Sequence, residues 1–138
     1  MSGQRLVRGL VPRLGAAAVL ALATASCWWV WMAWDHDYRI DPVTGEAVGP
    51  YEAWQVIGCG VCLVAVCVVA TLRLPVWIVV LVMPIAFMWA WAATAASTDS
   101  TGLWLVGAFM MLAGGVPLVA LVSSLTHLVR PRERTGRV

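Results

Sequence analysis

Three of the four cysteines are the residues of this chain best suited to chemistry. Cys59 and Cys62 form a C-x-x-C pair, and Cys27 lies in an earlier apolar segment. Thiols that face an oxidising compartment can form disulfides, so Cys27 facing Cys59 or Cys62 would make a thiol–disulfide oxidoreductase centre. The alternative is packing, because cysteine is a small apolar residue and Gly58 and Cys62 have the small-xxx-small spacing of closely packed membrane helices.

A second group with ligand chemistry is Asp35-His36-Asp37. Residues two apart face the same side of an extended chain, so Asp35 and Asp37 could share one cation. Arg39 stands where a calcium loop needs a third acid. We therefore expect solvated loop charges, no metal site and no cofactor. The sequence also contains no nucleophile elbow, P-loop or H-E-x-x-H motif.

These residues belong to a very apolar chain, 62% hydrophobic and 12% charged over 138 residues. Soluble domains have roughly 45–50% apolar and 25% charged residues. Four segments reach the roughly 20 apolar residues that a membrane helix needs, and none contains Asp, Glu, Lys or Arg. The segments are 14–34, 53–72, 74–96 and 103–129. The sequence predicts an all-α integral membrane protein, a bundle of four transmembrane helices with short loops and antiparallel neighbours.

The connections between these segments are short. Arg73 and the Leu74–Pro75 step alone separate the second segment from the third. A single helix over 53–97 would be about 68 Å long, twice the bilayer, so the chain must fold back at Pro75. In the loop 35–52, Pro42 and Gly45 favour a turn, which predicts a small outer β-hairpin between the first two helices. A lone hairpin is marginal in water, so we expect it to pack on the helix ends.

Arginine placement predicts the orientation. Arg39 is on one side, and eight arginines are on the other: Arg5, Arg8, Arg13, Arg73, Arg130, Arg132, Arg134 and Arg137. The arginine-rich side should be cytoplasmic. We expect a multi-pass plasma-membrane protein with a cytoplasmic basic N-terminus (1–13), one membrane domain (14–129) and a cytoplasmic basic tail (130–138). The first segment is expected to stay uncleaved, because its apolar run continues past the A-x-A site at 23–25.

This topology, together with the C-x-x-C, resembles the quinone-coupled thiol oxidase family of bacterial envelopes. Those proteins have four spans, both ends inside, and a C-x-x-C near the outer start of the second span, where this chain has Cys59 and Cys62. The resemblance implies electron relay from thiols to a quinone. The family also carries a second cysteine pair in its second outer loop, whereas the corresponding segment 97–102 has no cysteine.

Tryptophan is concentrated toward the outer side. Eight of the nine tryptophans belong to the outer half, and Trp77 is at the inner end. One interpretation is an outward-facing aromatic pocket for a lipid, isoprenoid or quinone. Its candidate residues are Trp28, Trp31, Trp34, Trp54, Trp89, Trp91 and Trp104. The other interpretation is anchoring in the outer leaflet and packing beneath the hairpin.

Several function classes are disfavoured by the charges. A net charge of +2 gives no electrostatic support for nucleic-acid binding. Ion-coupled transporters usually carry charged residues within their spans, and these spans have none. We therefore expect a small non-catalytic accessory or assembly protein of a membrane or envelope component. Its expected partners are the lipid bilayer and a membrane protein or a second copy of the chain; thiol redox chemistry and lipid or quinone binding are the alternatives.

Overall fold

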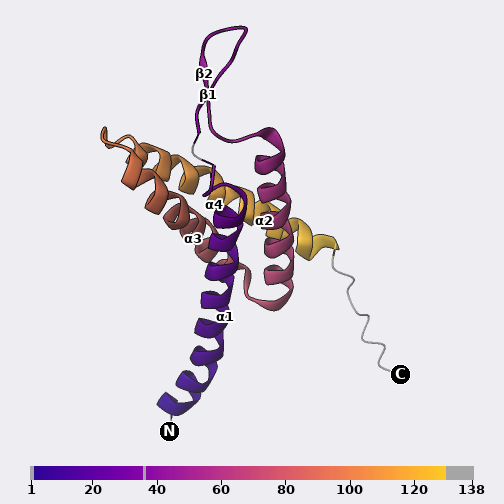
Figure 1. Cartoon of the computed structure of the whole chain (residues 1–138). Helices are drawn as coiled ribbons and strands as arrows, with labels where there is room; N and C mark the ends of the chain where they lie inside the picture. Colours follow the sequence, from indigo (N-terminus) through magenta and orange to yellow (C-terminus); the bar gives the residue numbers. More distant parts are fainter. Residues whose placement is uncertain (1, 36, 130–138) are drawn as a thin grey trace.

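The computed structural model describes residues 2–35 and 37–129, so the predicted tail at 130–138 lies outside the described residues. Over that part of the chain the fold is four helices and one two-stranded sheet (Figure 1). The elements are α1 (Ser2–Trp31), β1 (Arg39–Ile40), β2 (Ala47–Val48), α2 (Ala53–Arg73), α3 (Val76–Thr98) and α4 (Trp104–Val129). Each helix contains a stretch long and apolar enough to cross a membrane, which indicates a multi-pass membrane protein.

The helix ends differ from the expected segments in ways that the local chemistry explains. Helix α1 begins well before residue 14 and ends at Trp31. Beyond it the chain turns, and the backbone N–H groups of Met32 and Ala33 both donate to the carbonyl of Trp28. Between α2 and α3, Leu74 and Pro75 are non-helical, as expected for a proline that cannot continue the preceding helix.

The helices pack as two crossing pairs, α1 with α2 and α3 with α4. Helix α1 packs on α3 and α2, and α4 packs on α3 and α2. Helices α2 and α3 meet at few positions despite their short connection, and within the described residues no Cα atom of α1 lies within 8 Å of one in α4. Figure 1 shows the α3–α4 pair passing obliquely across the α1–α2 pair. The two helices joined by the shortest connection, α2 and α3, therefore share the smallest helix–helix interface.

Two buried clusters hold the helices together. One joins Leu20, Cys67, Ala70, Val79 and Met83, and the other joins Cys27, Trp28, Met32, Cys59 and Ala90. Polar contacts add to both ends of the bundle. The Thr71 hydroxyl donates to the Ser123 hydroxyl at 3.1 Å between α2 and α4, and the Gln55 amide donates to the Asp35 carboxylate at 3.2 Å. Every buried side-chain nitrogen or oxygen among the described residues has a hydrogen-bond partner.

The predicted hairpin is confirmed. Strands β1 and β2 are antiparallel, with Arg39 opposite Val48 and Ile40 opposite Ala47. Gly45 adopts a φ of 69°, which a residue with a Cβ rarely takes. The strands are fully exposed and the hairpin projects from the helices (Figure 1). The expectation that it packs on the helix ends is wrong; its main tie to them is the ion pair of Arg39 with Glu52, the residue before α2.

Candidate functional site

A cavity of about 510 Å³ lies at the hairpin end of the bundle. Its wall comes from α1, α3, α4 and the loop on either side of the hairpin. The lining residues are Trp28, Tyr38, Pro50, Tyr51, Trp91, Thr94, Ala95, Thr98, Asp99, Leu103, Trp104 and Gly107. We call it the outer cavity. It combines aromatic rings with hydroxyl groups and a carboxylate, the mixture that fixes the head of an amphipathic ligand.

Trp28 is the most deeply buried aromatic residue in the wall of the outer cavity. Its side chain is only 2% exposed. Its ring meets Tyr51 edge-to-face, with centroids 5.7 Å apart, and meets Phe87 in the same way at 5.8 Å. Its indole N–H donates to the Thr94 hydroxyl at 3.4 Å. The ring is carried by α1 and contacts both α3 and the loop before α2, so it ties these three parts of the cavity wall together.

Trp91 and Trp104 are positioned by different means. The Trp91 ring lies against Gly107, where an added Cβ would be 2.6 Å from the ring, so the absence of a side chain lets α3 and α4 approach. Trp104 begins α4, and its backbone N–H donates to the Asp99 carboxylate at 2.8 Å. This bond satisfies a free donor of the first helical turn. Asp99 therefore fixes both the start of α4 and the Trp104 backbone at the cavity wall.

The structure divides the seven candidate tryptophans. Trp28, Trp91 and Trp104 line the outer cavity. Trp31 and Trp54 pack edge-to-face at 6.1 Å, beside Gly58 and away from the cavity. Trp34 and Trp89 are exposed, and the indole of Trp34 donates to the Val30 carbonyl. These four match the composition of a bilayer-anchoring belt.

The electrostatics of the hairpin end come from a few groups. Among the described residues lining the outer cavity, Asp99 carries the only charge at neutral pH. The Thr101 hydroxyl, then the backbone N–H groups of Thr101 and Trp104, hold the pKa of Asp99 below its usual value. Burial raises the pKa of Tyr51. Outside the cavity, the hydrogen bond from Arg39 lowers the pKa of Glu52.

The structure brings the three redox candidates into one cluster. Cys27 and Cys59 are buried together, and Cys62 packs against them. Each buried thiol has a backbone partner: Cys27 Sγ donates to the Ala23 carbonyl at 3.3 Å, and Cys59 Sγ donates to the Cys27 carbonyl at 3.7 Å. All are free thiols in this structure. The arrangement allows close packing of α1 on α2. It also gathers three free thiols in one cluster, which is the arrangement that the redox interpretation requires.

The acidic candidates are separated by their surroundings. Asp35 is buried and accepts a hydrogen bond from Gln55, whereas Asp37 is exposed. The Gln55 amide oxygen also accepts from the Glu52 backbone N–H at 2.6 Å. Asp35 thus links the end of α1 to the first turn of α2. Among the described residues, no group of three or more His, Cys, Asp or Glu is arranged to hold a metal ion.

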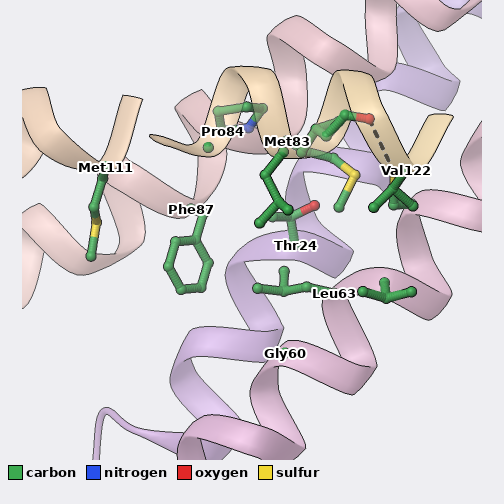
Figure 2. Close-up of a pocket in the computed structure, with 13 residues that line it drawn as sticks. Thr24, Gly60, Leu63, Met83, Pro84, Phe87, Met111 and Val122 are labelled. Atoms are coloured by element: carbon green, nitrogen blue, oxygen red, sulfur yellow. Dashed lines mark hydrogen bonds between the residues drawn. The ribbon is translucent and has the colours of Figure 1, made fainter. Parts of the chain in front are cut away.

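A second cavity, of about 360 Å³, lies deeper between the four helices. We call it the inner cavity. Its lining is almost wholly apolar, and Figure 2 shows Thr24, Met83 and Phe87 gathered between the helices. The Thr24 hydroxyl donates to the Leu20 carbonyl of its own helix at 2.8 Å. Sequence reasoning missed this cavity, because its wall combines residues from all four helices and so depends on how they pack.

Comparison of the chain with protein-family models, with curated proteins and with solved structures finds no match. The features of the molecule that bear on its function are therefore the two cavities, the thiol cluster and the positions of the charged residues. Of these, the outer cavity has the most developed combination of shape and polar groups.

Proposed function

We propose that this chain is a small non-catalytic membrane protein that binds the head of a lipid or quinone in its outer cavity. In this role it would act as an accessory or assembly partner of another membrane or envelope component. The observation that carries the proposal is the 510 Å³ cavity bounded by Trp28, Trp91 and Trp104 at the hairpin end. Aromatic rings offer flat apolar contact, while the Tyr51 hydroxyl and the Asp99 carboxylate offer polar contact.

The character of the cavity supports binding in preference to catalysis. Its one charged group, Asp99, already accepts hydrogen bonds from Thr101 and Trp104 and serves the start of α4. A general acid or base needs a pKa near the working pH, and the partners of Asp99 move its pKa the other way. The wall is suited to hold a polar head without acting on it.

The experiment is lipid analysis of the purified protein and two matched tryptophan variants. Trp104→Ala removes a ring from the outer cavity, whereas Trp89→Ala removes an exposed ring from α3 outside the cavity. Copurified lipids and quinones would be quantified by mass spectrometry per mole of protein. We expect Trp104→Ala to reduce one species by about threefold to tenfold, as loss of an aromatic contact implies. Equal retention by both variants would reject the proposal.

We propose that the cavity faces away from the cytoplasm, in a plasma membrane, with both chain ends cytoplasmic. The support is the arginine distribution: Arg73 lies at the α2–α3 connection, at the opposite end of α2 from Arg39 and the hairpin. A membrane-impermeant thiol reagent applied to intact cells tests this. Val43→Cys in the hairpin turn, where the side chain is 90% exposed, should react, whereas a cysteine added after Val138 should react only after lysis. The reverse pattern would invert the orientation.

A further inference from the structure

We propose that the outer and inner cavities form one elongated site, in which the inner cavity holds the hydrocarbon tail of the ligand. This inference rests on the proposed function, because it takes the outer cavity as the head-binding end. It adds a ligand class: a polar head that carries a long isoprenoid or acyl chain, of which one chain occupies the inner cavity. It also adds a route of entry, sideways from the bilayer between α2 and α4.

The two cavities are stacked along the same three helices. On α3, Phe87 lines the inner cavity and Trp91 lines the outer one. Met111 and Gly107 on α4 have the same relationship, and so do Thr24 and Trp28 on α1. Each pair is four residues apart, about 6 Å along a helix. The edge-to-face contact of Trp28 with Phe87 joins the two walls directly.

The chemistry of the inner cavity selects hydrocarbon. Its wall offers Met83, Phe87 and Met111, and the one hydroxyl, that of Thr24, is already bonded to the Leu20 carbonyl. A water molecule needs two to four polar partners and would find almost none. An empty space of 360 Å³ would forfeit the dispersion contacts of every lining atom. Hydrocarbon, the solvent of the surrounding membrane, fills such a space without either penalty.

The entrance to the inner cavity lies between α2 and α4, which touch at one end of α2 and are separated by the cavity nearer the other end. Towards the end of α2 that carries Arg73, the hydroxyl of Thr71 and the thiol of Cys67 both contact Ser123, which closes the gap between the helices. Nearer the hairpin end of α2, Gly60 and Val64 line the inner cavity and are exposed.

Leu118 of α4 stands opposite them, lining the same cavity with 60% of its surface exposed. A Cβ added to Gly60 would meet nothing within 4 Å. The inner cavity is therefore lined by exposed residues on its α2–α4 side, and we place the entrance from the bilayer there.

The outer cavity narrows the choice of head. Aromatic faces and the Asp99 carboxylate favour an uncharged ring or an ammonium group. No described lining residue of that cavity carries a positive charge, so a bare anionic head finds no counter-ion. Two ligands meet this requirement: an isoprenoid quinone, and an acyl lipid with an ammonium head such as phosphatidylethanolamine. Both have a head without net negative charge and a long hydrocarbon chain, and the experiment distinguishes them.

The test is photolabelling of the full chain in phosphatidylcholine nanodiscs. One probe is an isoprenoid quinone with a diazirine in its tail, and the other is phosphatidylethanolamine with a diazirine at the end of one acyl chain. Adducts are mapped by peptide mass spectrometry. We expect one probe to label Met83 and Phe87, which face the inner cavity, and the unlabelled form of the same molecule to compete. Competition by only one of the two identifies the source.

Two glycine variants show whether the label reports the cavity. Gly60→Leu places a side chain in the entrance, and Gly114→Leu adds the same group on α4 where nothing lies within 4 Å and no cavity is lined. Each methylene kept out of an apolar site lowers affinity about fourfold, so interior adducts should fall by that factor or more in Gly60→Leu. They should be unchanged in Gly114→Leu. Leucine is a better helix former than glycine, so both variants should fold.

The outcomes separate this inference from the proposed function. Tail labelling confined to exposed residues such as Leu81 and Leu105, with lipid retention still dependent on Trp104, would overturn the shared site and leave head binding in place. Interior adducts that persist at full strength in Gly60→Leu would also overturn it. Loss of both the interior adducts and the Trp104 dependence would remove the proposed function as well.

Discussion

The indole ring of Trp31 lies directly against the backbone of Gly58, where a Cβ added to the glycine would overlap the ring. The contact joins the end of α1 to the first turns of α2, beside the cluster that holds Cys27 and Cys59. The small-xxx-small spacing of Gly58 and Cys62 thus has a defined partner, a tryptophan ring.

Gly58→Ala should destabilise the protein. The new methyl group must displace the Trp31 ring, and overpacking of this kind costs about 1–3 kcal/mol. Gly60→Ala is the matched control, since its Cβ meets nothing and alanine is favoured over glycine in a helix by about 1 kcal/mol. Denaturation in detergent micelles, followed by far-UV circular dichroism, measures both. Equal stability of the two variants would show that Trp31 moves aside without penalty.

The hydroxyl pair between Thr71 and Ser123 should contribute measurable coupling between α2 and α4. Its 3.1 Å hydrogen bond is buried, and interhelical bonds of this type contribute about 0.6–1.7 kcal/mol in membrane proteins. A double-mutant cycle with Thr71→Val and Ser123→Ala measures it. Ser124→Ala is the control, because that exposed hydroxyl bonds to Ala120 in its own helix. Strict additivity of the two substitutions would contradict the assignment.

Asp99 should make stability depend on pH in the acid range. Hydrogen bonds from Thr101 and then Trp104 hold its folded-state pKa below the usual 3.8. A lowered folded pKa gives stability that is present above the unfolded pKa and is lost as pH falls through the folded pKa. Asp99→Asn should therefore be less stable than the parent near neutrality, with the difference shrinking below about pH 4. Thermal unfolding in detergent across pH measures this; a constant difference would reject a charge effect.

Thiol counting addresses the redox alternative. Membranes dissolved in SDS would be labelled with a maleimide polymer that shifts the band once for each free cysteine. We expect four labels without reductant, because Cys27, Cys59, Cys62 and Cys67 are all free in the structure. Two labels that appear only after reduction would instead show one disulfide, and single Cys27→Ser, Cys59→Ser and Cys62→Ser variants would identify its partners. Quinone-dependent reoxidation of that pair would then be the next measurement.

The sequence was sufficient for the helices and the hairpin but not for how the helices pack. Apolar length alone predicted four membrane-length helices, and Pro42 with Gly45 predicted the turn of the hairpin. Loop length misled about packing, because the two-residue connection at Leu74–Pro75 places α3 after α2 without forcing the two side by side. All faces of α3 and α4 are apolar, so no periodicity marks the face that meets another helix.

The candidate site was predicted in composition but not in geometry. Tryptophan enrichment pointed to the outer end, yet nothing in the spacing separated Trp91, which lines the cavity, from Trp89, which is exposed. Two positions along a helix differ by about 200° in direction, so that choice depends on how α3 is rotated in the bundle. The one sequence feature that bears on this choice is Gly107, because a glycine in α4 leaves room for the ring of Trp91.

The contacts of α1 with α2 and α3 have a consequence for biosynthesis. Helix α1 contacts both α2 and α3, so the first three helices can pack together before the last segment leaves the ribosome. The final helix then packs on helices that are already in place, on α3 and, through the Thr71–Ser123 bond, on α2. A chain arrested before residue 104 would be an assembly intermediate with an open side, and arrival of α4 would complete both cavities at once.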